Sequence, residues 1–222
     1  MSDSPPRFCS DEDLGRIGYD GRDAPKDLER WCCQGPWAEK RELLDVILAG
    51  GVDGAAVLDI GAGVGIAHVT LLEAGAASAV DVDASRDYIA TARAEAERRG
   101  LTGRIDYRYG DVVELADDLP PADIVIADRV ICCYPYLAPL LSAATASAPR
   151  LVGLSYINDD WWLRAWMRAW NVLWALRRRP DRWHIHRHRT VDRLMAAAAY
   201  EKIHDGGSWY WRVVVYRLAT AR

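Results

Sequence analysis

The chain has 222 residues, of which 50% are hydrophobic and 27% are charged, so it can bury a core and is not a disordered chain. The formal net charge of -4 gives no overall attraction to nucleic acid or to an anionic membrane surface. The five cysteines show no CxxC spacing, and no apolar run is long enough to span a membrane, so we expect a cytoplasmic protein without a zinc ribbon.

The first 36 residues are polar and acid-rich, and we expect them to form a cap segment with helical structure. A helical pattern over residues 37–48 ends at Gly50-Gly51. Apolar runs then alternate with amphipathic ones. The predicted strands cover residues 55–60, 77–82, 105–109, 122–127 and 151–157, and the predicted helices cover residues 66–74, 85–100 and 137–147.

Continuous apolar strands separated by helices are typical of a parallel sheet that is covered on both faces. The end of the chain departs from this alternation, because two predicted helices, residues 160–178 and 190–200, follow each other. Gly206-Gly207 then separates strand-like runs over residues 201–204 and 209–218, which indicates a hairpin. We therefore predict an α/β fold with an open, mostly parallel seven-stranded sheet, helices on both faces and an antiparallel C-terminal hairpin.

The most informative segment is VLDIGAGVG at residues 57–65, an apolar strand that runs into a glycine-rich turn and a helix. Glycines allow positive φ angles and a close approach of the backbone to a ligand, and the helix start offers free N–H groups. Asp81 lies twenty residues beyond Gly61, at the end of the next predicted strand. An acid at that distance binds ribose hydroxyls in dinucleotide-binding folds, so the spacing predicts a nucleotide-containing cofactor.

Two details argue against a dinucleotide. Ile66 stands where the GxGxxG motif has its third glycine, and Asp59 before the turn suits an ammonium group better than a pyrophosphate. With VLDIGAGVG, AVDVDAS, Gly110-Asp111 and Asp128-Arg129-Val130, residues 55–157 resemble the class I S-adenosylmethionine-dependent methyltransferases. The resemblance implies a Rossmann-like fold and S-adenosylmethionine as the cofactor.

The resemblance also implies roles for individual residues. Gly61, Ala62, Gly63 and Gly65 would lie under the methionine part and the ribose, Asp59 would face the amino-acid end, Asp81 would bind the ribose hydroxyls, Val82 would pack on the adenine, and Gly110, Asp111 and Val112 would form the pocket of the adenine amino group. The alternative, that the acids are solvated strand ends or helix caps, stays open for Asp111 and still more for Asp83.

The segments after the fourth and fifth predicted strands decide the acceptor. No proline precedes Cys132 or Cys133, as it would in RNA cytosine methylation, and no Pro-Pro-aromatic motif follows Asp128, so we expect no nucleic-acid substrate. Asp128, Asn158 and Asp159 could offer oxygen ligands to Mg²⁺ in the manner of catechol O-methyltransferases. We prefer helix capping for Asn158 and Asp159 and predict no metal site.

Residues 161–193 carry nine arginines and two acids, and six of the ten tryptophans lie between Trp161 and Trp183. Four of them, Trp162, Trp166, Trp170 and Trp174, form one ridge on a helix. Three interpretations compete: a face that packs on the sheet, a lid over an aromatic substrate, and a helix that rests on a membrane. We prefer packing and place the membrane last. We assign residues 37–222 to the methyltransferase domain, with residues 160–189 as a lid-like insertion.

These features predict in-line methyl transfer from S-adenosylmethionine to oxygen or nitrogen of a small, planar and possibly anionic acceptor, in specialised metabolism. His188, Tyr134 and Asp128 are the candidates for accepting a proton from the acceptor. His188 stands just before a predicted helix, in a tail that loosely resembles the magnesium-protoporphyrin O-methyltransferase branch. The alternatives are a metal-assisted catechol-type enzyme, a cofactor-binding protein without turnover, and a nicotinamide-dependent oxidoreductase. The oligomeric state stays open.

Overall fold

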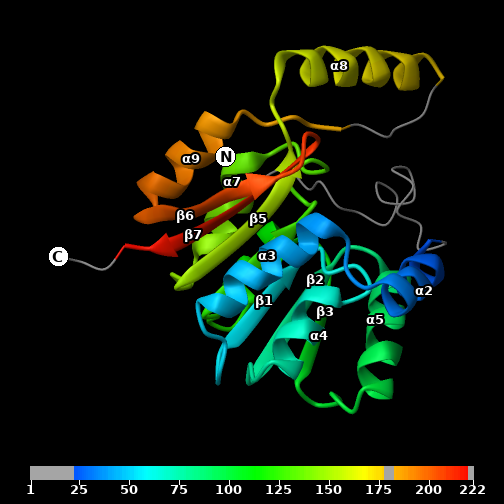
Figure 1. The fold of residues 1–222 in the computed structure, drawn as a ribbon, viewed down its shortest axis with the longest axis vertical. Helices are drawn as coiled ribbons and strands as arrows, with labels where there is room; N and C mark the ends of the chain where they lie inside the picture. The colour runs from blue at the N-terminus through cyan, green and yellow to red at the C-terminus, as the bar shows by residue number, and fades with distance from the viewer. Residues whose placement is uncertain (1–22, 178–182, 220–222) are drawn as a thin grey trace, which may run out of the picture.

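A seven-stranded sheet forms the centre of the protein in a computed structural model that describes residues 23–177 and 183–219 (Figure 1). The strands are β1 (Ala56–Ile60), β2 (Ser78–Asp83), β3 (Ile105–Tyr109), β4 (Ile124–Asp128), β5 (Leu151–Ile157), β6 (Tyr200–Gly207) and β7 (Trp211–Leu218). Their order across the sheet is β3-β2-β1-β4-β5-β7-β6. β1 to β5 pair in parallel, whereas β7 runs antiparallel to both β5 and β6. The predicted mostly parallel sheet with an antiparallel C-terminal pair is confirmed.

Helices cover both faces of the sheet (Figure 1). One face carries α2 (Ala24–Gln34), α3 (Ala38–Ala49), α4 (Ile66–Glu73) and α5 (Arg86–Arg98), and the other carries α6 (Val112–Leu115), the 3-10 helix η1 (Ala116–Asp118), α7 (Leu137–Thr145) and α9 (His188–Ala197). Successive side chains along a strand point to opposite faces of the sheet, so the core is divided into two apolar clusters. Val57 of β1 belongs to the first cluster and Leu58 to the second.

The hairpin forms as predicted, but its turn lies elsewhere. Gly206 and Gly207 belong to β6, and the turn is made by residues 208–210. A Cβ atom on Gly207 would lie 2.2 Å from the carbonyl oxygen of Trp211, and its φ angle is +110°. The glycine is therefore needed where the two strands approach each other, next to the turn. The preceding helix α9 also ends at Ala197, three residues before the predicted end.

The tryptophan-rich helix α8 (Trp161–Leu176) lies apart from the layers of the fold, at the top of Figure 1. Leu163 and Met167 are its buried residues. The preferred interpretation, that its tryptophan ridge packs on the sheet, is wrong, because Trp162 and Trp166 are exposed. In the described parts of the chain, no helix has the length and apolar character needed to cross a membrane.

Helix α3 packs directly on β5 because Gly153 has no side chain. A Cβ atom there would lie 2.8 Å from Cδ1 of Ile47 and 2.9 Å from Cδ1 of Leu43. This contact matters for the site, because α3 supplies part of its wall.

We expect Gly153→Val to lower the free energy of unfolding by about 1–3 kcal/mol, because the added side chain overpacks the contact between α3 and β5. Urea denaturation measures the change. Ser78→Val is the matched control, since it adds bulk at an exposed strand position and should change stability by less than about 0.5 kcal/mol. Equal urea midpoints for Gly153→Val and the wild type would contradict the packing described.

Candidate functional site

A cavity of about 550 Å³ lies at the carboxyl ends of β1, β2 and β4. Its walls come from four parts of the chain. They are Gly61, Ala62, Gly63, Val64 and Ile66 after β1; Asp83, Ala84, Ser85 and Tyr88 after β2; Asp128, Arg129, Val130, Cys133 and Tyr134 after β4; and Asp27, Arg30, Trp37 and Lys40 from the N-terminal helices. In open α/β sheets, ligands bind at this edge where the strand order reverses, here between β1 and β4.

The turn after β1 has the backbone conformation that its glycines allow. Gly61 and Gly63 both have φ angles of +62°, and Gly65 has +84°. The N–H group of Gly63 donates a hydrogen bond to Asp83 Oδ2 at 2.9 Å, and the N–H group of Ser85 donates to Asp83 Oδ1 at 2.8 Å. The Asp83 carboxylate is thus fixed between two loops at the cavity wall. Burial raises the pKa of Asp83 to about 6, although these N–H groups oppose the shift.

Asp81, for which a ribose contact is predicted, lies away from the described cavity wall. It is fully buried and is not among the described residues that line the cavity. Neither of its carboxylate oxygens has a hydrogen-bond partner in the described parts of the chain. Burial raises the pKa of Asp81 well above its usual value, and the charges of Asp59 and Asp83 add to this. The physical reason is that β2 continues to Asp83, so Asp81 sits two residues inside the strand, opposite Asp59 and Tyr107 on its neighbours.

Asp59 of β1 contacts His68 of α4, the helix that follows the glycine turn. Its carboxylate accepts a hydrogen bond from the N–H group of His68 at 3.2 Å and lies 3.0 Å from His68 Nδ1. A Cβ atom on Gly65 would lie 2.7 Å from Nε2 of the same imidazole. Asp59 and Gly65 therefore pack the start of α4 against the sheet, and neither is among the described lining residues.

The structure brings only part of the predicted cofactor set to the cavity. Gly61, Ala62 and Gly63 line it, whereas Asp59, Gly65, Asp81, Val82, Gly110, Asp111 and Val112 are outside its lining as described. Asp111 caps α6 by accepting from the N–H group of Val113 at 2.9 Å, and the Tyr134 hydroxyl donates to it at 2.8 Å. The cap interpretation of Asp111 thus has support, and Asp83 is the acid of β2 that lines the cavity.

Two of the three predicted proton acceptors, Asp128 and Tyr134, line the cavity, but the polar atoms of both already interact with other residues of the chain. Lys40 Nζ lies 2.9 Å from Asp128 Oδ2, with both side chains buried, and the Ser155 hydroxyl donates to the other oxygen. Tyr134 donates to Asp111. Both side chains therefore hold the loop after β4 in place.

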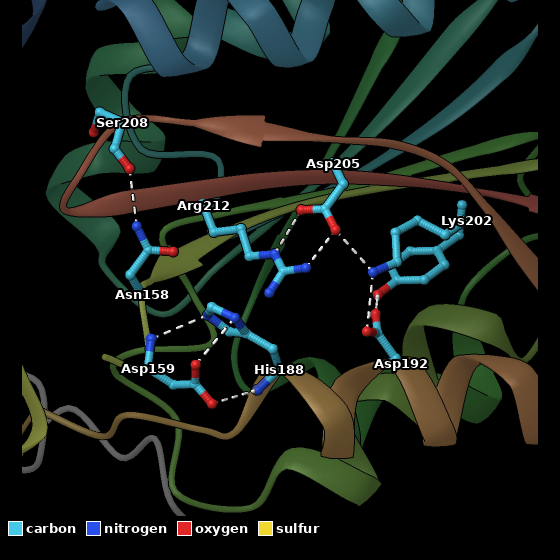
Figure 2. A network of polar contacts seen from close by, with 9 residues as sticks. Asn158, Asp159, His188, Asp192, Lys202, Asp205, Ser208 and Arg212 are labelled. Atoms are coloured by element: carbon cyan, nitrogen blue, oxygen red, sulfur yellow. Dashed lines mark hydrogen bonds and ion pairs between the residues drawn. The ribbon is translucent and has the colours of Figure 1, made fainter. Parts of the chain in front are cut away.

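His188, the third predicted proton acceptor, is outside the described lining and lies in a separate polar network (Figure 2). Its Nε2 accepts from the N–H group of Asp159 at 3.0 Å, and its Nδ1 lies 3.1 Å from Asp159 Oδ1. Burial and the charge of Arg212 lower the pKa of His188, and Asp159 opposes them. Asn158 uses its side chain to donate to the Ser208 carbonyl at 2.8 Å. Within residues 23–177 and 183–219, no three His, Cys, Asp or Glu side chains gather as metal ligands would.

A basic and aromatic wall surrounds Trp37, in keeping with the expected planar and possibly anionic acceptor, although none of its residues is among the predicted site residues. The guanidinium carbon of Arg129 lies 4.3 Å from the Trp37 ring centre and 4.5 Å from the Trp211 ring centre. Arg30 lies 4.9 Å and Lys40 Nζ 5.3 Å from the Trp37 ring. Arg30 Nη1 is buried without a hydrogen-bond partner in the described chain. In the sequence, the signal for this wall is the tryptophan content of the N-terminal segment.

Part of the chain is similar in sequence to known methyltransferases. Residues 57–150 match a family model described as a methyltransferase domain. The ribosomal protein L11 methyltransferase of Enterobacter sp. (strain 638) is 34% identical over 107 residues, which cover 48% of this chain and 35% of that protein. The chain thus spans about a third of the length of this curated relative.

A crystal structure of magnesium protoporphyrin IX methyltransferase from Synechocystis PCC 6803 with bound SAH has a TM-score of 0.69 at 18% identity and covers 94% of this chain and 100% of that one. The same protein with bound SAM has a TM-score of 0.68 at 17% identity, with 99% and 100% covered. Residues 57–150 are thus similar to a methyltransferase domain, and the chain shares the fold of these methyltransferase structures.

Proposed function

We propose that this protein transfers a methyl group from S-adenosylmethionine to a small-molecule acceptor, and that the cavity beside the glycine turn holds the cofactor. One observation carries the proposal. The turn of Gly61 and Gly63, the Asp83 carboxylate and the Arg30 side chain meet at a single cavity, and the turn and Asp83 belong to the residues that match the methyltransferase model.

The donors and acceptors at the cavity fit this cofactor. Each oxygen of Asp83 accepts one backbone N–H group, which leaves lone pairs for the two ribose hydroxyls. The buried, unpartnered Nη1 of Arg30 suits the carboxylate of the methionine part, because a guanidinium forms charge-assisted hydrogen bonds with carboxylates. The volume of about 550 Å³ is within the usual range for small-molecule sites.

The cofactor, when bound, supplies an electrophilic methyl group on its sulfonium. The residues of this chain align the reactants and exclude water, and such positioning can contribute about 7–11 kcal/mol. Asp128 and Tyr134 act as positioning residues, since their polar groups are used by Lys40, Ser155 and Asp111. Methyl transfer by such positioning does not require a general base.

The wall around Trp37 supports a planar, anionic acceptor. Three cationic side chains, Arg30, Lys40 and Arg129, lie around its ring, and Arg129 also lies over Trp211. Aromatic rings bind planar molecules by stacking, and guanidinium groups attract carboxylates. Lys40 is paired with Asp128, and Arg129 lies 3.6 Å from Glu39 Oε2, so Arg30 is the cation of this wall with a buried N–H group that the described chain does not use. The second candidate is a protein acceptor, which the named activity of the Enterobacter relative favours.

Calorimetry with S-adenosylhomocysteine tests the cofactor assignment. We expect the wild type to bind it and NADPH not to compete. Gly63→Arg should abolish binding, because its side chain fills the cavity. Gly103→Arg is the matched control, since Gly103 also has a positive φ angle with no atom near its Cβ direction but lies outside the described lining. Absence of binding to the wild type, or equal binding to Gly63→Arg, would refute the proposal.

The pH dependence of binding separates Asp83 from Asp81. Since the pKa of Asp83 is raised to about 6, the carboxylate that accepts ribose hydroxyls is lost as the pH falls through 6. Affinity for S-adenosylhomocysteine should therefore rise from pH 5 to pH 7 and then level off. Asp83→Asn should weaken binding at pH 7 by about tenfold or more and flatten the profile, because a hydrogen bond to a charged group is lost.

Asp81→Asn is the matched control for this experiment, and it should keep both the affinity and the pH profile of the wild type. A loss of affinity in Asp81→Asn with no loss in Asp83→Asn would show that the ribose is bound elsewhere than we propose.

A further inference from the structure

Helix α8 carries an apolar surface that the described parts of the chain leave uncovered. Trp161 is 79% exposed, Trp166 is 62% exposed and Leu176 is 77% exposed. Val172 on the same helix is 60% exposed, and Trp209 in the β6–β7 turn is 70% exposed. Soluble proteins rarely expose so many large apolar side chains together, so such a patch indicates an interaction site.

The opposite side of α8 holds the helix on the protein. Leu163 and Met167 are buried in a small cluster with Ile157, and Asn171 exchanges two hydrogen bonds with the backbone of Trp183. At 100° per residue, Trp161, Val172 and Leu176 lie on the side of the helix away from Met167. The apolar face is thus turned away from the cluster that holds the helix on the protein.

Stacked rings join the helix to the hairpin turn. Trp162 stacks on Trp209 with ring centres 5.8 Å apart and planes 19° apart. Trp166 stacks on Trp170 at 6.2 Å, and Trp170 lies 4.4 Å from Trp174. Tryptophan combines a large apolar ring with one N–H donor, which suits the boundary between water and lipid acyl chains.

The charges on the helical residues of α8 are all positive, with Asp160 at its N-cap as the neighbouring acid. From Trp161 to Arg177 the chain has Arg164, Arg168 and Arg177 and no acid, although the whole chain carries a net charge of -4. Arg164 and Arg168 lie one turn apart, beside the apolar face by helical spacing. This distribution is complementary to a negatively charged partner.

We propose that α8 and Trp209 bind the surface of a membrane that contains anionic lipids. The helix lies in the plane of the interface, with Trp161, Val172 and Leu176 at the acyl boundary and the arginines at the lipid phosphates. A tryptophan-rich apolar face with arginine on its polar side is the pattern of interfacial helices, and the arginines of α8 favour anionic lipid over a neutral apolar partner. No residue of α8 is among the described lining residues of the cavity, so membrane binding is separable from cofactor binding.

Sedimentation with lipid vesicles tests the proposal. The full chain should bind vesicles of phosphatidylglycerol and phosphatidylcholine, bind pure phosphatidylcholine at least about tenfold more weakly, and lose binding as salt is added. Combined Trp161→Ser, Trp166→Ser and Leu176→Ser should weaken binding to the mixed vesicles at least about tenfold. Arg168→Gln should weaken it about fivefold.

Ile203→Ser is the matched control, because Ile203 is an exposed apolar residue on β6, and it should bind vesicles like the wild type. Calorimetry with S-adenosylhomocysteine verifies that each variant keeps the wild-type affinity and is therefore folded.

Four results would overturn the proposal. The wild type could fail to bind the mixed vesicles at low salt, or the triple variant could bind them as well as the wild type. A wild-type dimer that the triple variant converts to a monomer would show that a second copy covers α8. Removal of residues 1–22 could increase quenching of tryptophan fluorescence by acrylamide, which would show that the chain covers this surface itself.

Discussion

The site depends on the reversal of strand order between β1 and β4. The chain leaves β1 toward the face covered by α4 and leaves β4 toward the face covered by α7, so the two loops diverge and open a crevice between them. At the base of the crevice the loops touch, since a Cβ atom on Gly61 would lie 2.5 Å from Val130 Cγ2. The packing of these two loops therefore requires the glycine, in addition to any requirement from a ligand.

The N-terminal helices turn this crevice into a cavity, and polar contacts hold them in place. The buried pair of Lys40 and Asp128 joins α3 to the end of β4, and the Tyr88 hydroxyl donates to Asp27 of α2 at 2.9 Å. Separating a buried ion pair is costly, because each charge would be left without a partner. The position of Trp37, and with it the basic wall of the cavity, follows from these contacts.

The fold was predictable because its signals are local. β1, β4 and β5 are mainly apolar runs, β3 is a short alternating segment (IDYRY), and the glycine turn follows β1 directly, so both the sheet and the turn appear in the sequence. Asp81 and Asp83 share one face of β2, so alternation cannot choose between them, and the choice depends on where the strand ends.

Other features depend on contacts distant in the sequence, which no local pattern reports. His188 is separated from the cavity by its bonds to Asp159, 29 residues earlier. Arg30 and Lys40 reach the cavity only through the packing of α2 and α3. The ridge of α8 shows that a helix is amphipathic, but helical spacing does not say whether the apolar face is covered.

A crystal structure of the protein grown with S-adenosylhomocysteine tests the central claim most directly. The account predicts the ligand in the cavity beside Gly61 and Gly63, with its ribose hydroxyls within hydrogen-bond distance of Asp83 and its carboxylate on Arg30. A ligand bound outside this cavity, or one whose ribose contacts neither oxygen of Asp83, would contradict it.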